Sequence, residues 1–330
     1  MKKRTANQAN FAENIRKYAL LFILIVMCIV FSIAVPTFHS MANIMNVLRQ
    51  ISINGILAIG MTMIICIGGI DLSIGPLCAM AGVVSALILE NTPTFPTFIA
   101  ILIGVASSAV MSMWTAFLVA YVGIAPFIAT LSTMSVAKGM TLVIADGMPH
   151  TIHSEFYTNI GNGFVWDPQL TGNVALPVPV VVLICVFIVM YIILYRTKFG
   201  RYVYAVGGNE NAAIAAGIKT TRVKFAAYIL NGLICGVAGT VLAGRITSGN
   251  PTAAEGYEMD AITATIVGGT SMTGGVGSTW GTMVGVLIIG VLNNGLVLFR
   301  VSSYYQTIIK GLIVAFAVIL DMKTKGSHKN

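Results

Sequence analysis

The sequence predicts an all-α polytopic membrane protein, and three observations support this fold class. Of the 330 residues, 57% are hydrophobic and only 9% are charged, whereas soluble domains carry roughly 25% charged residues. Several apolar runs reach the roughly 20 residues that an α-helix needs to cross a bilayer. The basic residues are gathered into a few segments between these runs. A water-soluble fold is therefore excluded, because it would have too few charges to cover its surface.

Ten apolar runs are expected to cross the membrane as helices. The first imitates a secretory signal peptide, but its apolar part is longer than that of a signal and more runs follow, so we expect it to stay as an uncleaved span. The runs form one transmembrane domain, residues 18–321, between an N-terminal segment (1–17) and a C-terminal tail (322–330). They are residues 18–36, 52–69, 74–90, 97–120, 124–145, 177–195, 225–244, 259–276, 279–298 and 305–321.

The placement of charge predicts the topology. Residues 1–17, the 196–224 loop and the tail are rich in lysine and arginine, whereas the 146–176 loop has acidic residues and no lysine or arginine. Basic segments remain in the cytoplasm. With ten crossings, both termini and the 196–224 loop are expected in the cytoplasm and the 146–176 loop outside. The net charge of +8 therefore reflects membrane topology rather than a nucleic-acid-binding face.

Two of the runs are interrupted by glycines and resemble each other, which indicates an internal repeat. Backbone groups freed at a break need partners, so broken spans occur where they are buried in protein or line a wet cavity. Paired breaks in the two halves of a transporter point to the translocation pathway, but glycines also permit close helix packing, and both interpretations stay open. The matching residues are Gly68, Gly69 and Gly75 in residues 64–76, and Gly268, Gly269 and Gly275 in residues 259–278.

Asp71 follows the first break, at membrane depth, where a carboxylate is costly and needs a reason. Because Asp71 and Ser73 precede an apolar run, the carboxylate is expected to cap the next helix. Contact with substrate, or proton coupling in an ion-driven secondary transporter, is the alternative. Lys138 also lies within a span, where it is expected to snorkel to an interface or to pair with a nearby carbonyl.

The sequence contains no pattern that predicts catalysis. It has no Gly-Lys dipeptide and so no phosphate-binding loop for ATP, and it shows no catalytic constellation. The five cysteines lie in apolar segments without a CxxC pair, and no metal-ligand set is expected. We therefore expect a transport protein without a cofactor or metal of its own. A channel or an intramembrane enzyme is the rival class.

The stretch GRYVYAVGGNENAAIAAGI, residues 200–218, predicts a short capped helix in the basic loop. Asn209 is a good N-cap, and Glu210 in the first turn complements the helix dipole. The short residues 211–216 favour a helix, and Gly217 suits the left-handed position after its end. The helix would be about 12 Å long. It is either an ordinary interfacial helix or a handle for another protein.

This stretch resembles the cytoplasmic coupling loop in permease subunits of bacterial sugar ABC importers of the ribose, galactose and xylose branch, which is related to branched-chain amino acid permeases. Within this branch, the stretch resembles the ribose permeases. Four further blocks resemble the same family in the same order along nearly the whole chain: GMTMIICIGGIDLSIG (60–75), PFIATLSTM (126–134), PTAAEGYEMDAITATIVGGTSMTGGVG (251–277) and LNNGLVLFRVSSYYQTIIKG (292–311).

The resemblance implies a homodimeric permease in the bacterial inner, or cytoplasmic, membrane, surrounded by lipid. Each subunit would dock a cytoplasmic ABC ATPase, which carries MgATP on its own chain. An extracytoplasmic sugar-binding protein would deliver a ribose-like monosaccharide to the outer face. The same fold carrying a nucleoside, an autoinducer or another sugar is the alternative within the family.

The resemblance and the residue types together give three sets of candidate residues. Amides, hydroxyls and aromatic rings suit an uncharged sugar, and charges at the outer face suit a binding protein. Tyr304 and Tyr305 also suit an aromatic belt at the membrane interface. The ATPase-coupling set is Asn209, Glu210, Asn211, Ala212, Ala213 and Gly217; the pathway set is Gly68, Gly69, Asp71, Ser73, Gly268, Gly269, Asn293 and Asn294; the docking set for the binding protein is Glu255, Glu258, Asp260, Ser303, Tyr304 and Tyr305.

Overall fold

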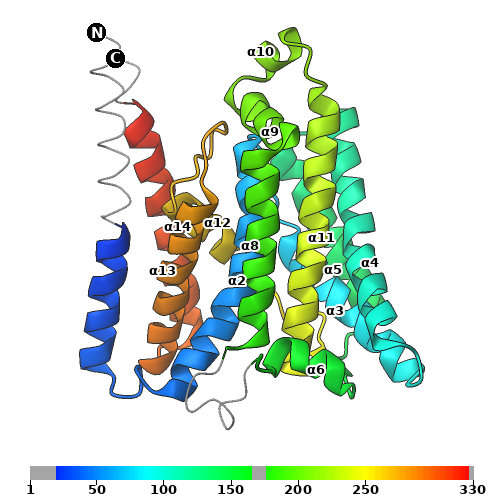
Figure 1. Ribbon diagram of the computed structural model, residues 1–330, viewed down its shortest axis with the longest axis vertical. Coiled ribbons are helices and arrows are strands. Elements are labelled where there is room, and N and C mark those ends of the chain that lie inside the picture. The colour runs from blue at the N-terminus through cyan, green and yellow to red at the C-terminus, as the bar shows by residue number, and fades with distance from the viewer. Residues whose placement is uncertain (1–19, 166–175, 327–330) are drawn as a thin grey trace.

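The computed structural model describes residues 20–165 and 176–326, which are almost entirely helical (Figure 1). A helix over Leu20–Ala34 precedes the labelled elements. A short antiparallel pair joins β1 to β2. The labelled elements are α2 (Met41–Cys66), α3 (Ile74–Asn91), α4 (Thr97–Phe117), η1 (Leu118–Val122), α5 (Pro126–Ile144), β1 (His150–Thr151), α6 (Glu155–Asn162), α8 (Val178–Arg196), α9 (Lys198–Gly208), α10 (Glu210–Ala215), α11 (Thr220–Ile246), β2 (Ser248–Gly249), α12 (Tyr257–Val267), α13 (Thr279–Leu298) and α14 (Ser303–Gly326).

The all-α polytopic fold class is confirmed. Within the described residues, seven helices are long and apolar enough to cross a membrane, and two shorter apolar helices cover Leu20–Ala34 and Ser303–Ile319. Together with α12, these helices fall on the ten runs expected from the sequence. For the three shorter ones, a complete crossing stays a prediction.

The helix α12 is only 11 residues long and spans about 16 Å, so the run 259–276 is not one continuous helix. The chain leaves the helix at Gly268 and turns through Gly269, Gly274 and Gly275, all three with positive φ angles. Glycine adopts this backbone region without steric cost. The glycines that marked the break in the sequence therefore form a loop that leads into α13.

The helix α2 begins at Met41, eleven residues before the run 52–69 that predicted it. Ser40 caps it by accepting a hydrogen bond from the Asn43 amide at 3.3 Å. Its first turns are polar, and their side chains have partners: Arg49, for example, donates to the carbonyl of Asn162 in α6 at 2.8 Å. Hydropathy missed these turns because their polar groups bond inside the protein.

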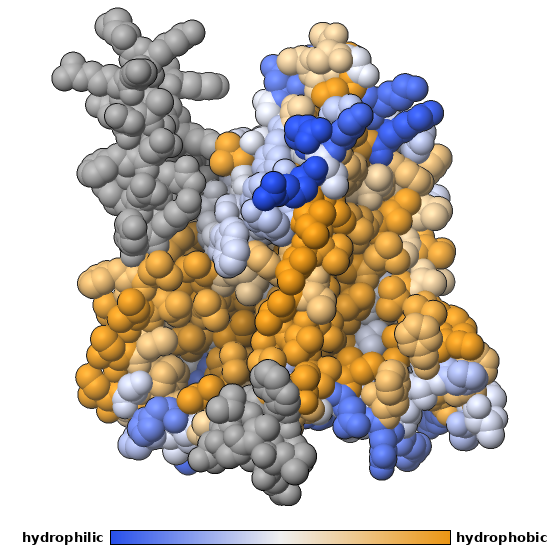
Figure 2. All heavy atoms as spheres, in the orientation of Figure 1, coloured by the Kyte–Doolittle hydropathy of each residue, from blue (hydrophilic) through white to orange (hydrophobic). Residues whose placement is uncertain are grey.

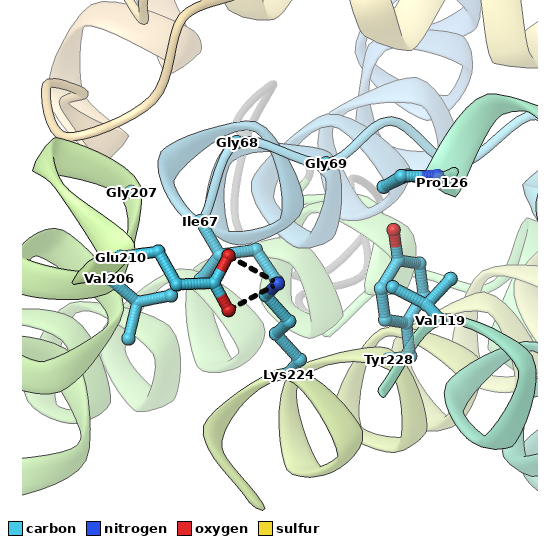
Figure 3. Close-up of a pocket in the computed structure, with 10 residues that line it drawn as sticks. All are labelled: Ile67, Gly68, Gly69, Val119, Pro126, Val206, Gly207, Glu210, Lys224 and Tyr228. Carbon is cyan, nitrogen blue, oxygen red and sulfur yellow. Dashed lines mark hydrogen bonds and ion pairs between the residues drawn. The ribbon is translucent and has the colours of Figure 1, made fainter. Parts of the chain in front are cut away.

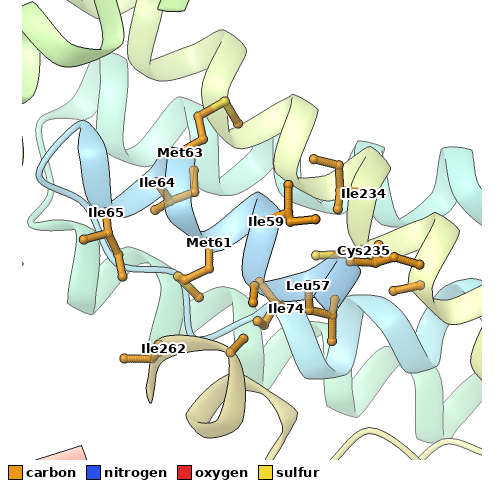
Figure 4. Close-up of a cluster of buried hydrophobic side chains, with 14 of the residues drawn as sticks. Leu57, Ile59, Met61, Met63, Ile64, Ile65, Ile74, Ile234, Cys235 and Ile262 are labelled. Atoms are coloured by element: carbon orange, nitrogen blue, oxygen red, sulfur yellow. The ribbon is translucent and has the colours of Figure 1, made fainter. Parts of the chain in front are cut away.

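The core lies around the second half of α2, where every residue from Ile51 to Cys66 is buried. A helix that is apolar all round requires neighbours on all sides. Figure 4 shows its side chains against α3, α11 and α12. Close approach of α11 depends on glycine, since a Cβ at Gly239 would collide with the carbonyl of Cys78 in α3.

The surface divides into a hydrophobic band between two hydrophilic ends (Figure 2). One end carries α9 and α10, and the other carries α6 (Figure 1). The 196–224 segment at the first end holds six basic residues against one acidic residue. The positive-inside rule assigns this end to the cytoplasm. We call it the inner end and the opposite one the outer end.

Candidate functional site

At the inner end, the helix α10 begins as the sequence predicts. The Asn209 side chain accepts a hydrogen bond from the Ala212 amide at 3.0 Å, which satisfies one of the free N–H groups of the first turn. Glu210 lies in that turn. Its carboxylate also pairs with the Lys224 ammonium of α11, with an N–O distance of 2.6 Å. The start of α10 is thus fastened to the start of α11.

The end of α10 also agrees with the prediction. Gly217 has a φ angle of +81°, and its amide donates to the Ile214 carbonyl at 2.9 Å. The Ile218 amide donates to the Ala213 carbonyl at 3.0 Å. These two bonds form a Schellman motif, which stops a helix sharply. The loop helix is therefore a short unit that is capped at both ends.

The α10 helix presents an apolar side chain to solvent. Ala213 is buried against the protein, while Ile214 is 55% exposed. Beside the end of α10 lies a surface hollow of about 450 Å³. Its walls include Phe199, Tyr202 and Val223 together with Lys219 and Arg222. A partner that is apolar at its centre and acidic at its rim fits this surface.

Three segments that are distant in the sequence meet beneath α10. The Gly275 amide donates to the Cys66 carbonyl at the end of α2, at 2.9 Å. Gly207, in the last turn of α9, lies so close that an added Cβ would collide with the same carbonyl. The Tyr204 hydroxyl of α9 donates to the Gly277 carbonyl at 3.1 Å. The loop between α12 and α13 is therefore joined to both α2 and α9.

The two glycine-interrupted stretches touch each other at this junction. An added Cβ at Gly274 would come within 3.0 Å of the Gly68 Cα atom. Both residues have φ angles of +79°, so glycine serves both conformation and close approach here. The sequence likeness between the two stretches thus corresponds to proximity in space. Their meeting next to Gly207 and Gly208 was not predicted from the sequence.

A cavity of about 330 Å³ lies beside this junction (Figure 3). In Figure 3 the Glu210 carboxylate faces the Lys224 ammonium on one side, and the Tyr228 side chain lies on the other. The cavity therefore touches the break after α2 together with η1, α5, α9, α10 and α11. Its lining residues are Ile67, Gly68, Gly69, Val119, Pro126, Val206, Gly207, Glu210, Lys224 and Tyr228.

Asp71 is completely buried and has three donors. Its Oδ1 accepts from the Ser73 amide at 2.9 Å and from the Ser73 hydroxyl at 2.5 Å, just before α3 begins. Its Oδ2 accepts from the Asn231 side chain at 2.8 Å. These contacts compensate the burial of the charge. Asp71 thus forms a turn with Ser73, the N-cap residue of α3, but no side-chain hydrogen bond caps α3 itself, so the expected capping of that helix by Asp71 is not observed.

A second buried carboxylate, Asp260, belongs to α12. It accepts hydrogen bonds from the Asn293 side chain at 3.0 Å and from the Lys310 ammonium at 2.9 Å. Glu258 is also buried and lies against Gly75. Buried groups offer no surface to a protein partner in this conformation. The docking expectation therefore does not fit Asp260 and Glu258, which the sequence placed outside because a continuous span was expected to start at residue 259.

The other candidates divide between the interior and the surface. Asn294 is buried and exchanges two hydrogen bonds with Asn43, at 2.8 and 3.0 Å. Tyr304 and Tyr305 are 82% and 65% exposed near the outer start of α14, where Ser303 is exposed too. Their role in docking stays a prediction.

Lys138 of α5 pairs with the carboxylate of Glu255 at an N–O distance of 2.6 Å, and not with a carbonyl as the sequence predicted. The side chains remain 44% and 57% exposed in the single chain. Lys138 lies two turns before the outer end of α5. A charged pair on the outside of a membrane-embedded helix does not suit contact with lipid.

Sequence reasoning missed four residues of these clusters: Lys224, Tyr228, Asn231 and Lys310. The first three are spaced i, i+4 and i+7 in a stretch of α11 that is otherwise apolar from residue 224 to 231, which places them on one face. That spacing was a usable signal. Lys310 is a lone cation in an apolar run and carried the same kind of signal. Among the described residues, no group of three or more His, Cys, Asp or Glu side chains could hold a metal ion.

The fold and this inner-end site define a class: a polytopic helical transport protein with a capped loop helix over broken membrane segments. Comparison with known proteins agrees. A family model described as "Branched-chain amino acid transport system / permease component" matches residues 43–318. The chain belongs to this permease family. No solved structure matches it.

Several relatives carry names of sugar permeases. The Bacillus subtilis "Ribose import permease protein RbsC" is 44% identical over 91% of this chain and 91% of its own length. The protein of the same name from Haemophilus influenzae is 39% identical over 97% of both chains. The Escherichia coli K12 "L-arabinose transport system permease protein AraH" is 33% identical over 92% of this chain and 90% of its own length. The present chain is accordingly a multi-pass protein of the bacterial inner membrane.

Proposed function

We propose that this chain is the permease subunit of an ATP-driven ABC importer for a ribose-like monosaccharide. A separate ATPase docks on the α10 helix and hydrolyses MgATP on its own chain. An extracytoplasmic binding protein delivers the sugar at the outer end. Two copies of the chain enclose the path.

The observation that carries this proposal is the position of α10. The helix is capped at both ends, is fastened to α11 by the Glu210–Lys224 pair, and directly follows Gly207 and Gly208, which touch the junction of both glycine breaks. Exposed Ile214 and the adjoining hollow with Lys219 and Arg222 give a partner both an apolar anchor and a basic rim. Buried apolar anchors with a charged rim are typical of protein interfaces.

The second copy is supported by the outer surface of α5. Only 28% of its most apolar window is buried within the single chain. Its exposed face includes Ser132, Ser135 and Gly139, and small residues of this kind permit close packing of membrane helices. The exposed Lys138–Glu255 pair lies beside this face. A second copy, or a water-filled path between copies, can pack against the small residues and solvate the charged pair. Lipid is a poor environment for the charged pair.

The sugar class rests on the relatives, because the ribose permeases cover nearly the whole chain. The buried amides Asn293 and Asn294 are of a type that suits a hydroxylated solute near the path, and such a solute would replace their present partners Asp260 and Asn43. The binding protein is expected to use Glu255, Ser303, Tyr304 and Tyr305 at the outer end. Asp71, whose oxygens are occupied by Ser73 and Asn231, gives no support to ion coupling.

The proposal is tested by uptake into proteoliposomes. The chain is reconstituted with a cognate ATPase inside and a ribose-loaded binding protein outside. We expect ribose accumulation that requires ATP and both partners, with weaker uptake of arabinose. Uphill uptake by the chain alone, driven by a proton or sodium gradient, would instead establish the secondary-transporter class.

A further inference from the structure

One face of α11 carries three polar residues that reach three different parts of the inner half of the molecule. Lys224, Tyr228 and Asn231 are spaced i, i+4 and i+7, so their side chains align along one stripe. The helix is otherwise apolar over this length. We call these residues the α11 stripe. The re-entrant segment that Tyr228 and Asn231 contact, residues 67–73, links the end of α2 to the start of α3.

The first contact is with the loop helix. Lys224 donates to both carboxylate oxygens of Glu210, with N–O distances of 2.6 and 2.7 Å. Its side chain is only 22% exposed, so the pair is more restrained than a solvated one. Any displacement of α10 therefore acts first on the beginning of α11.

The second contact is with the glycine break. Tyr228 is fully buried, and its hydroxyl donates to the Ile70 carbonyl at a long 3.4 Å. The hydroxyl also lies 2.6 Å from where a Cβ at Gly69 would stand. The backbone of the re-entrant segment thus lies against the hydroxyl end of the Tyr228 side chain (Figure 3).

The third contact is the buried Asn231–Asp71 bond of 2.8 Å. Asp71 in turn accepts from Ser73 at the start of α3. Asn231 is held from its other side, because an added Cβ at Gly60 of α2 would collide with its Oδ1. The amide has little room to move away from the carboxylate.

The helix that bears the stripe is firmly joined to α4. Ser112 donates to the Tyr228 carbonyl at 2.6 Å, and Ser108 donates to the Gly232 carbonyl at 2.8 Å. An added Cβ at Gly232 would collide with Ser112, so the two helices pack closely. They can move as one body, while the re-entrant segment is an irregular backbone held from α11 through side chains.

We infer that the α11 stripe transmits displacement of α10 to the re-entrant segment and the start of α3, with Lys224 and Asn231 as positioning residues. The inference rests on the proposed function, because it names how the docked ATPase acts on the path. Lys224 receives the movement, and Asn231 delivers it to Asp71. Between Lys224 and Asn231, the Tyr228 side chain holds the glycine break against α11.

The test measures sugar carried per ATP hydrolysed in the reconstituted importer. In Asn231→Asp, two carboxylates face each other, and we expect the ratio to fall about tenfold, since a charge-assisted hydrogen bond becomes a repulsion. In the exchanged variant Asp71→Asn/Asn231→Asp, the amide and carboxylate trade places and the ratio should return to within about twofold of wild type. ATPase co-purification should be unchanged in both variants.

A second arm keeps the inference testable if Asn231→Asp folds poorly. Lys224→Met removes the first contact at the protein surface, and it should lower the same ratio. If both residues act in one pathway, loss of either contact already interrupts it. The sugar-to-ATP ratio of Lys224→Met/Asn231→Asp should therefore be no lower than that of the worse single variant. Independent effects at separate sites would multiply, and that result would overturn the inference.

The outcomes separate this inference from the proposed function. If wild type shows no ATP-dependent uptake with its partners, the proposed function fails. If wild type transports and both single variants keep its sugar-to-ATP ratio, only the transmission role fails. A lower yield of folded Asn231→Asp protein with a wild-type ratio would likewise show that the stripe is only structural.

Discussion

The amide of Gly275 donates a hydrogen bond to the carbonyl oxygen of Cys66, at 2.9 Å across 209 positions of sequence. The carbonyl belongs to the last residue of α2, whose helical acceptors have no partner within the helix. The loop after α12 therefore completes the end of α2. Since Gly207 touches the same carbonyl, one backbone group connects both glycine-interrupted stretches with the segment that carries α10.

This crowding predicts that Gly207 tolerates no side chain. In Gly207→Ala the new methyl group would collide with Cys66 and push α9 away from α2. We expect loss of ATP-dependent uptake and a lower thermal midpoint of the detergent-solubilised protein. Gly208→Ala is the matched control, because no atom lies within 4 Å of its added Cβ. Equal behaviour of the two variants would contradict the junction.

The caps of α10 predict a defect in coupling rather than in folding. Asn209→Ala removes the bond to the Ala212 amide and should cost the helix about 1 kcal/mol. Gly217→Val forces a β-branched residue into a left-handed conformation and should be worse. Membrane insertion is expected to be normal, while sugar uptake per ATP falls. Glu210→Lys should act similarly by repelling Lys224. Unchanged uptake and ATPase co-purification in all three variants would count against the docking role.

We expect the Lys138–Glu255 pair to contribute to sugar uptake by the assembled importer more than to the stability of the single chain. Lys138→Glu places two like charges together at the outer half of α5, and it should reduce uptake while leaving ATPase co-purification unchanged. The exchanged variant Lys138→Glu/Glu255→Lys should restore a large part of uptake. No restoration would mean that each charge acts separately, for example on the binding protein.

The Asp260–Lys310 pair predicts a stability effect. Lys310→Met leaves the buried carboxylate of Asp260 with only Asn293, and loss of one partner of a buried pair typically costs about 3 kcal/mol or more. We expect a marked fall of the thermal midpoint in detergent. Asp260→Asn/Lys310→Met removes the unpaired charge, and it should recover a large part of the lost thermal midpoint. A double variant as unstable as Lys310→Met would contradict the pairing.

Local features of the inner-end site could be read from the sequence because they depend on neighbouring residues. The N-cap at Asn209, the left-handed Gly217 and the Asp71–Ser73 turn each follow from side-chain chemistry within a few positions. The same holds for the fold class, since the length and hydropathy of the runs define membrane helices.

Long-range relationships could not be read in the same way. The meeting of Gly68 with Gly274 and the partners of Asp260 depend on how helices pack. The early start of α2 at Met41 depends on polar residues whose bonds are made by distant elements such as α6. A hydropathy window counts such residues as solvated, and it therefore places Asp260 outside and cuts α2 short.

The most direct test of the central claim is a crosslink from α10 to the ATPase. A photoreactive residue replaces Ile214, which is 55% exposed on that helix, and Val143 on the outer half of α5, 77% exposed, serves as the control position. In inverted membrane vesicles with the reconstituted ATPase, the account predicts an adduct between the ATPase and position 214 and none at position 143. Normal ATP-driven uptake by the same variant in right-side-out proteoliposomes, without any adduct at position 214 in the inverted vesicles, would contradict it.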